Sequence, residues 1–186
     1  MIAYHVDRVN SLAPGMSLTL EKPQANEPTA PYLNDYFPDG ISRAGDVYIG
    51  DLLFYLPDIA QRFKEIEFEL ARRTHFTDMP SRFQSFFCCK TMDSAQQWLK
   101  LLGPLDGINP IIWEVEIAGP TFELDAFWRD RKCSTNVAGY INGQIYCHWE
   151  NMLDAHRYWS GIISDSPSLE LMTSLSTPVI VKGPTA

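Results

Sequence analysis

Three separated segments of the 186-residue chain hold the side chains best suited to chemistry. The first contains His5 and Arg8, the second is the Ser- and Arg-bearing run 81–85, and the third contains Glu170. A carboxylate can stabilise positive charge that develops on a sugar during bond cleavage. Arginine and histidine can hold a phosphate, and a serine hydroxyl can orient a neighbouring group. The order of the segments, their spacing and their apolar surroundings support the inference that the three segments form one site.

Hydrophobic periodicity indicates the elements that must position these residues. Short strands are expected at residues 2–9, 82–89, 111–117, 121–124, 169–172 and 178–181, together with a hairpin that turns at Asn142–Gly143. Helices are expected at residues 58–74, 93–102 and 151–159. Many short strands interrupted by a few helices are typical of an α+β domain. The sequence therefore predicts one α+β domain over residues 1–186.

The expected helix at 58–74 is the clearest one in the sequence. Asp58 and Gln61 form an Asp-x-x-Gln capping box at its start. Its apolar residues recur at helical spacing and predict the buried face: Ile59, Phe63, Ile66 and Leu70. The second helix is expected to begin near Asp93 and to stop at Gly103.

Residues 22–46 are rich in Pro, Asn, Asp and Gly and show no apolar period. This composition predicts a long loop or small insertion that reaches over a cleft or a partner. The aromatic pair Tyr36 and Phe37 within it favours either a binding loop or a loop pinned to the core. Both interpretations place the segment outside the regular elements.

Composition excludes some classes of function. The net charge of −8 disfavours nonspecific binding of nucleic acid, which requires Lys and Arg to neutralise phosphates. No apolar run approaches the roughly 20 residues that a bilayer-spanning helix needs. The first residues lack the pattern of an ordinary secretory signal peptide. We therefore expect a soluble protein without a membrane partner, located in the bacterial cytoplasm or exported as an effector.

Neither the cysteines nor the basic clusters indicate a metal or a nucleophile. Cys88, Cys89, Cys133 and Cys147 show no zinc-type spacing, so free thiols and no metal site are expected. Cys147, followed by His148, lacks the flanking residues of an activated thiol. The basic cluster of Arg129, Arg131 and Lys132 is interpreted as a solvated face.

The three segments, taken in order, resemble the ADP-ribosyltransferase superfamily. Tyr4-His5 is similar to the Tyr-Arg or Tyr-His of its first strand, and residues 82–87 followed by Ala95 resemble its serine-bearing middle strand and next helix. Glu170 with the Val-rich strand at 178–181 matches the last motif best. Residues 158–161, Tyr-Trp-Ser-Gly, look like bacterial effector or toxin members, including those that modify ubiquitin on threonine. The resemblance spans most of the chain.

The resemblance implies a pair of small β-sheets that form an NAD+ cleft flanked by helices. It implies NAD+ as co-substrate, with Glu170 and Ser85 as catalytic residues. The residues that it implies for cofactor binding are His5, Arg8, Ser81, Arg82 and Tyr158. In this scheme His5 or Arg8 holds the diphosphate or the adenine ribose, Arg82 adds a phosphate contact, and Tyr158 stacks on nicotinamide.

The chain departs from the superfamily pattern at two places. It has no Ser-Thr-Ser triplet, and Ser168 stands where some members carry a second Glu or Gln before the catalytic Glu. That departure argues against arginine as the modified residue and leaves hydroxyl acceptors, other nucleophiles or water. The implied activity is mono-ADP-ribosylation of an acceptor protein, with host ubiquitin as one candidate, by a monomeric enzyme. The alternatives are an NAD+ glycohydrolase, transfer to a small molecule or nucleic acid, and a non-catalytic α+β binding domain.

Overall fold

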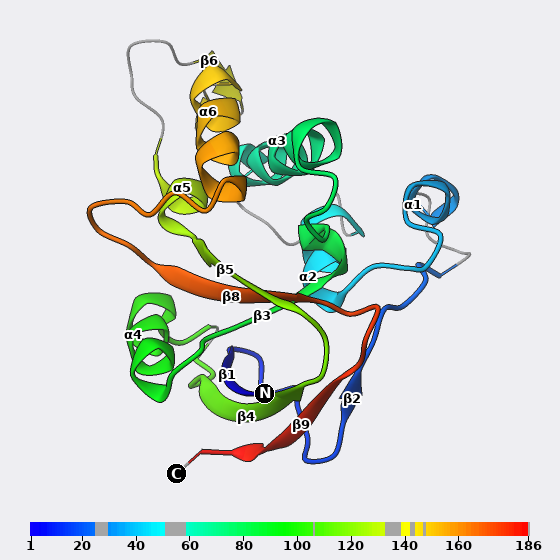
Figure 1. Ribbon diagram of the computed structural model, residues 1–186, viewed down its shortest axis with the longest axis vertical. Helices are drawn as coiled ribbons and strands as arrows, with labels where there is room; N and C mark the ends of the chain where they lie inside the picture. Colours follow the sequence, from blue (N-terminus) through cyan, green and yellow to red (C-terminus); the bar gives the residue numbers. More distant parts are fainter. Residues whose placement is uncertain are drawn as a thin grey trace.

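The chain folds into two main antiparallel sheets with helices around them (Figure 1). The structure is a computed structural model that describes residues 1–24, 30–50, 59–105, 107–132, 139–141, 144–146 and 148–185. Helices α3, α5 and α6 lie on one side of the strands β5 and β8, and the larger sheet lies on the other side (Figure 1). The predicted α+β class is therefore confirmed.

The larger sheet has the strand order β1-β4-β9-β2. Its strands are β1 (Ile2–Asp7), β4 (Ile111–Ile117), β9 (Val179–Pro184) and β2 (Ser17–Leu18). In β4, Trp113, Val115 and Ile117 are buried, whereas Glu116 is exposed. The predicted alternation holds for these residues, but Ile112, expected on the opposite face, is also buried and packs in a second cluster with Ala95 of the helix at 92–102.

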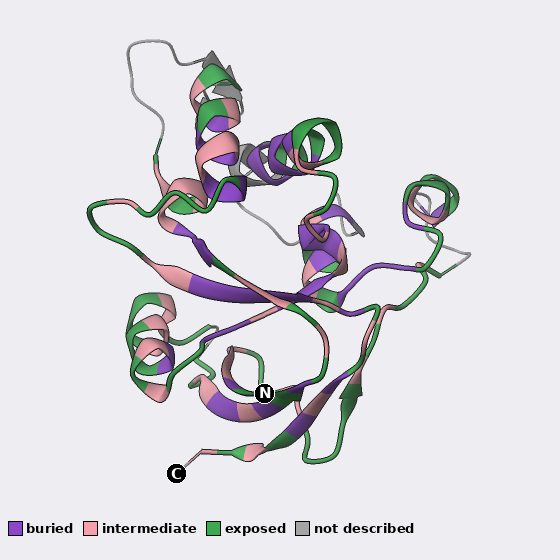
Figure 2. Cartoon of the chain, viewed as in Figure 1, coloured by how far each residue is buried: buried purple, intermediate pink, exposed green. Residues whose placement is uncertain are grey.

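The smaller sheet has the strand order β3-β8-β5. Its strands are β3 (Ser85–Cys88), β8 (Leu169–Ser174) and β5 (Thr121–Asp125). The central strand β8 is buried over most of its length (Figure 2). Tyr4 and Cys89 exchange two backbone hydrogen bonds of 2.9 and 2.7 Å, which join the end of β3 to β1. This junction brings the first two of the three segments together.

A third pair of strands, β6 (Gly139–Ile141) and β7 (Gln144–Tyr146), forms the expected hairpin. Its predicted turn at Asn142–Gly143 lies outside the described residues, as does the predicted capping residue Asp58. The expected helices appear as α3 (Ile59–His75), α4 (Met92–Leu102) and α6 (His148–Trp159). A short helix, α5 (Phe127–Asp130), follows β5. None of the helices in the described part of the chain is long and apolar enough to cross a membrane.

Several predicted boundaries differ from the structure, and in two segments the type of element was wrong as well. Residues 22–46 include the helices α1 (Ala30–Tyr36) and α2 (Arg43–Gly45), and a π-helix runs from Asp46 to Gly50. Residues 82–84 form a 3₁₀ turn capped by Ser81, so the strand begins only at Ser85. Short helices of this kind depend on caps and tertiary contacts, and they leave no apolar period in the sequence.

The buried face predicted for α3 was also wrong. Phe63, Ile66 and Leu70 are 41%, 44% and 53% exposed. The face that turns inward includes Phe68 and Ala71, which pack with α6 and β8, and four charged residues: Lys64, Glu65, Glu67 and Glu69. Arg82 pairs with Glu65, and Arg72 and Arg73 pair with Glu69, so these two buried carboxylates are compensated. Apolar periodicity alone cannot detect a face that is buried through ion pairs.

The end of α4 matches the expectation. Gly103 adopts φ +59° and its backbone N–H donates to the carbonyl of Leu99. Glycine tolerates this left-handed conformation without a side-chain clash. At the other end of the helix, the cap is Thr91, two residues before Asp93, where the helix was expected to begin.

Candidate active site

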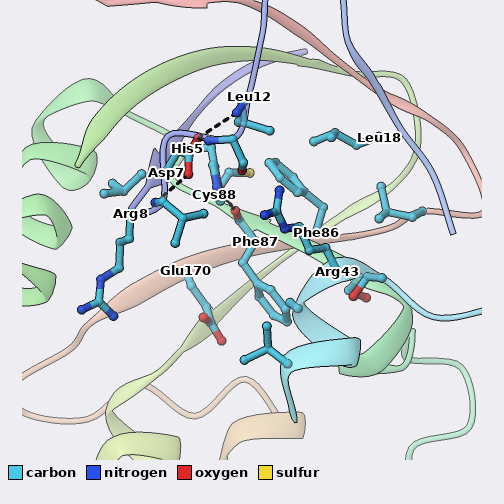
Figure 3. A pocket seen from close by; sticks show the side chains of 18 of the residues that line it. His5, Asp7, Arg8, Leu12, Leu18, Arg43, Phe86, Phe87, Cys88 and Glu170 are labelled. Carbon is cyan, nitrogen blue, oxygen red and sulfur yellow. Dashed lines mark hydrogen bonds between the residues drawn. The ribbon is translucent and has the colours of Figure 1, made fainter. Parts of the chain in front are cut away.

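A cavity of about 460 Å³ opens between β1, β3 and β8 (Figure 3). Four of the residues expected at the site line it: His5, Arg8, Ser85 and Glu170. They come from all three of the separated segments. The volume falls in the range of roughly 300–1,000 Å³ that is usual for small-molecule and cofactor sites.

Glu170 is the carboxylate at the inner side of this cavity. It is 5% exposed, and its Oε1 accepts hydrogen bonds from Arg82 Nη1 and from the hydroxyl of Tyr158, both at 2.7 Å. Its Oε2 lies 3.6 Å from Arg129 Nη1. Burial by itself would raise the pKa of Glu170, but Arg82, Arg129 and these hydrogen bonds outweigh burial and lower the pKa overall. Glu170 is therefore ionised at neutral pH.

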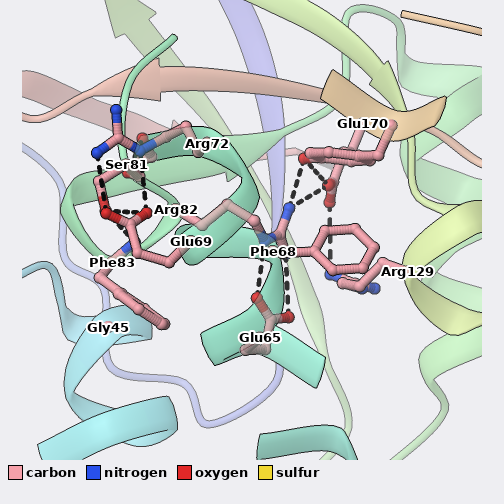
Figure 4. A network of polar contacts seen from close by, with 12 residues as sticks. Gly45, Glu65, Phe68, Glu69, Arg72, Ser81, Arg82, Phe83, Arg129 and Glu170 are labelled. Carbon is pink, nitrogen blue, oxygen red and sulfur yellow. Dashed lines mark hydrogen bonds and ion pairs between the residues drawn. The ribbon is translucent and has the colours of Figure 1, made fainter. Parts of the chain in front are cut away.

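Arg82 lies behind Glu170 and does not line the cavity (Figure 4). Its Nε donates to Glu65 Oε2 at 2.8 Å, and its Nη1 contacts both Glu170 and Tyr158. The guanidinium also lies over the rings of Phe87 and Tyr158, with its central carbon 4.6 and 5.1 Å from the ring centroids. Burial opposes the charge of Arg82, but the neighbouring Glu65 raises its pKa well above the usual value. Arg82 therefore holds the carboxylate in place and is not exposed to a phosphate in the cavity.

Two further expected site residues are also outside the cavity. Tyr158 is fully buried and contributes its hydroxyl to Glu170 from behind, so it offers no face for stacking on a ligand. Ser81 donates its hydroxyl proton to Glu69 at 2.9 Å and caps the 3₁₀ turn. Tyr158 thus supports the carboxylate, and Ser81 supports the turn that leads to β3.

His5 projects from β1 toward the cavity and packs against Phe86 with a centroid distance of 4.6 Å. Its Nδ1 lies 2.7 Å from the carbonyl oxygen of Phe87. Because a carbonyl can only accept, Nδ1 carries the proton and Nε2 remains an acceptor. Burial lowers the pKa of His5 despite this hydrogen bond, so the ring is neutral at pH 7.

Arg8 follows β1 and supplies a positive charge to the cavity wall. Its Nε atom is buried and has no hydrogen-bond partner among the described residues. Asp7 fixes the loop after it by accepting backbone hydrogen bonds from Val9, Ser11 and Leu12 at 2.7–3.0 Å. The loop is thus held in place while Arg8 keeps an unused donor beside the cavity.

Ser85 lies at the start of β3 with its side chain fully buried. Its hydroxyl donates to the carbonyl of Ser81 at 2.6 Å. That hydrogen bond uses the proton of the hydroxyl and leaves the oxygen able to accept.

Sequence reasoning missed several polar side chains of the cavity, among them Arg43, Tyr48 and Arg129. Arg129 was assigned to a solvated basic cluster, and the structure corrects this. Its Nε and Nη2 pair with Asp130 at 2.7 and 2.8 Å, and Nη1 is directed toward Glu170. The basic cluster was a usable signal for Arg129. Arg43 lies in the segment 22–46 that was expected to be irregular, and Tyr48 lies in the π-helix just after that segment.

Cys88 and Cys89 also line the cavity and are free thiols. Burial raises the pKa of both, to about 12 for Cys89, so both are protonated and weakly nucleophilic at neutral pH. The structure holds no group of three or more His, Cys, Asp or Glu side chains placed to bind a metal, within the part of the chain that it describes. Cys133 and Cys147 lie outside that part.

Comparison with known proteins adds a family and no activity. No curated protein matches the chain significantly. A family model described as "Protein of unknown function (DUF2441)" matches residues 3–182, which include all three segments of the cavity. Because the match covers nearly the whole sequence, the chain belongs to the DUF2441 family.

Proposed function

We propose that this protein is a mono-ADP-ribosyltransferase that uses NAD+ to modify a protein side chain. One observation carries the proposal: a buried, ionised carboxylate from β8, a serine from β3, His5 from β1 and Arg8 just after β1 line a single cavity. These are the residue types, in the chain order, that suggested the resemblance to ADP-ribosyltransferases. The two antiparallel sheets are compatible with that fold.

In the proposed reaction, the bond between the nicotinamide nitrogen and C1′ of its ribose breaks, and nicotinamide leaves with both electrons as a neutral molecule. Positive charge develops on the ribose and is stabilised by the carboxylate of Glu170. Its Oε2 is the oxygen available to the substrate, because Oε1 is occupied by Arg82 and Tyr158. The acceptor oxygen then bonds to C1′ and loses its proton.

The remaining residues of the cavity have roles in binding. Arg8, with its unpartnered Nε, is the proposed ligand of the diphosphate. His5 Nε2 can accept a hydrogen bond from a ribose hydroxyl, because its Nδ1 is already committed to Phe87. Tyr48, Phe86 and Phe87 offer aromatic surface for the nicotinamide or adenine ring.

The proposed acceptor is a hydroxyl on a protein, and ubiquitin threonine is one candidate. Ser168 in place of a second Glu or Gln argues against guanidinium as the acceptor. The backbone N–H of Ser168 donates to Asp125 at 2.8 Å, which fixes the chain two residues before Glu170. An effector role in a host cell would follow from that acceptor.

The test is incubation of the purified protein with NAD+ labelled in its adenylate moiety and a cell lysate. Wild type and the Glu123→Gln variant should label a discrete protein, whereas Glu170→Gln should not. Glu123 is a suitable control because it lies on the neighbouring strand β5 and pairs only with the exposed Lys90 in the described structure. Nicotinamide release without labelled protein would indicate an NAD+ glycohydrolase. Absence of both label and nicotinamide would reject NAD+ chemistry in favour of a binding domain.

A further inference from the structure

We infer that Glu65 of α3 is a positioning residue that controls Glu170 through the guanidinium of Arg82. The inference rests on the proposed function, in which Glu170 stabilises the developing positive charge. Glu65 is fully buried and does not line the cavity, so it cannot contact a substrate directly. Its influence on the reaction must pass through Arg82.

Glu65 occupies one edge of the Arg82 guanidinium (Figure 4). Its Oε2 accepts from Nε at 2.8 Å and its Oε1 accepts from Nη2 at 3.3 Å. Only Nη1 remains for the other side, where it contacts Glu170 Oε1 at 2.7 Å and the Tyr158 hydroxyl at 2.5 Å. Because Glu65 holds the guanidinium in this orientation, Arg82 contacts only Oε1 of Glu170. The other oxygen of Glu170, Oε2, therefore stays available on the cavity side.

Glu65 also balances the charge around the reacting carboxylate. Two guanidinium groups, Arg82 and Arg129, lie next to Glu170, and Glu65 compensates one of them. Asp130 pairs with Arg129, so removal of Glu65 would leave Arg82 with a single carboxylate among the described residues, that of Glu170. Its residual negative potential, which the transition state needs, would fall.

Loss of Glu65 has a second consequence for geometry. The freed Nε and Nη2 of Arg82 would seek new acceptors, since buried guanidinium donors are costly to leave unpaired. Glu170 is the carboxylate already bound to the same guanidinium. A two-point pair between them would draw Oε2 away from the cavity.

Glu69 provides a matched control in the same helix. It is also buried, at 6% exposure, one turn after Glu65. It pairs with Arg72, Arg73 and Ser81, none of which contacts Glu170 in the described structure. Replacing Glu69 by Gln therefore removes a buried carboxylate of similar structural importance without altering the environment of Glu170.

The test compares Glu65→Gln, Glu65→Asp and Glu69→Gln in steady-state cleavage of NAD+. For Glu65→Gln we expect kcat to fall by at least about tenfold, which is about 1.4 kcal/mol, with KM for NAD+ nearly unchanged. Glu65→Asp retains the charge and should recover part of the lost kcat, and Glu69→Gln should keep the wild-type kcat. Equal kcat values for Glu65→Gln and Glu69→Gln would overturn the inference. If Glu65→Gln does not fold, Glu65→Asp decides: wild-type kcat in that variant, despite its shortened reach, would count against positioning.

A second measurement separates this inference from the proposed function. The carboxyl carbon of Glu170 can be titrated by ¹³C NMR in the free protein, with its resonance assigned by its loss in Glu170→Gln. Glu65→Gln should lower the pKa of Glu170 further, and Glu69→Gln should not. If the pKa shifts in this way but the protein does not cleave NAD+, the proposed function is rejected, whereas the influence of Glu65 on Glu170 is retained. NAD+ cleavage by wild type without the shift would reject the coupling alone.

Discussion

At the scale of single residues, the structure distinguishes two residues, His5 and Arg8, to which the sequence assigned the same role. His5 and Arg8 were both assigned to cofactor binding, and both line the cavity. His5 is neutral and uses one ring nitrogen for the carbonyl of Phe87. Arg8 retains its positive charge and a buried donor without a partner in the described structure. In the proposed function, the main electrostatic contact to the diphosphate is therefore assigned to Arg8.

Replacement of Arg8 by alanine should weaken NAD+ binding. A hydrogen bond to a charged group contributes about 1.5–3 kcal/mol, so we expect a rise of Kd by roughly 10- to 100-fold. Isothermal titration calorimetry with NAD+ measures this Kd. His5→Asn is the companion variant, for which we expect a smaller rise of Kd. An unchanged Kd for Arg8→Ala would reassign the diphosphate to Arg43 or Arg129, the other arginines that line the cavity.

At the scale of elements, α2 supports the cavity wall through a close backbone contact. The carbonyl of Phe83 accepts from the backbone N–H of Ser42 at 2.7 Å. A Cβ on Gly45 would lie 2.2 Å from the same carbonyl oxygen. The contact joins the helix that carries Arg43 to the turn that carries Arg82, so two parts of the site depend on a residue with no side chain.

Gly45→Ala should destabilise the protein by about 1–3 kcal/mol, because the added methyl group must displace backbone atoms. Urea unfolding followed by circular dichroism gives this difference. Gly183→Ala is the control, since a Cβ there meets no atom within 4 Å. Equal stability of Gly45→Ala and Gly183→Ala would show that α2 can shift without cost.

Sequence patterns predicted most of the strands and the long helices, because alternation and helical spacing are local properties. Gly103 as the end of α4 followed from local backbone chemistry in the same way. The inward face of α3 was not predictable, since Glu65 finds its partner Arg82 seventeen residues later. For the site, Glu170, Ser85, His5 and Arg8 were anticipated through their order along the chain. The supporting positions of Arg82 and Tyr158 required the three-dimensional contacts.

At the scale of the whole molecule, buried ionisable groups make the free energy of unfolding depend on pH. Backbone hydrogen bonds lower the pKa of Asp7 and Asp125 in spite of their burial, and Arg82 and Arg129 do the same for Glu170. In the range just below the ordinary carboxyl pKa of about 4, the unfolded chain binds more protons than the folded one. The stability that these groups contribute is present above that range and is lost as the pH falls through their folded-state pKa values.

His5 adds a further loss of stability on acidification, which begins at a higher pH than that of the carboxylates. Burial lowers its pKa in the folded protein, so below the ordinary value of about 6.5 protons favour the unfolded chain. The free energy of unfolding should therefore decline first below about pH 6.5 and again below about pH 4. Urea titrations at pH 7, 5.5 and 3.5 measure both steps, and His5→Asn should remove the first one alone. A free energy of unfolding that does not change between pH 7 and 5.5 in wild type would contradict the neutral, half-buried state of His5.

The central claim is that Glu170 completes a site for cleavage of NAD+. The most direct measurement is nicotinamide release from NAD+ by wild type, Glu170→Gln and Glu123→Gln, with NAD+ binding measured in parallel. We expect Glu170→Gln to bind NAD+ with nearly wild-type affinity and to lose roughly 100-fold or more in turnover, while Glu123→Gln remains active. Near-wild-type turnover by Glu170→Gln would contradict the mechanism. Failure of the wild-type protein to bind NAD+ would contradict the assignment of the cavity itself.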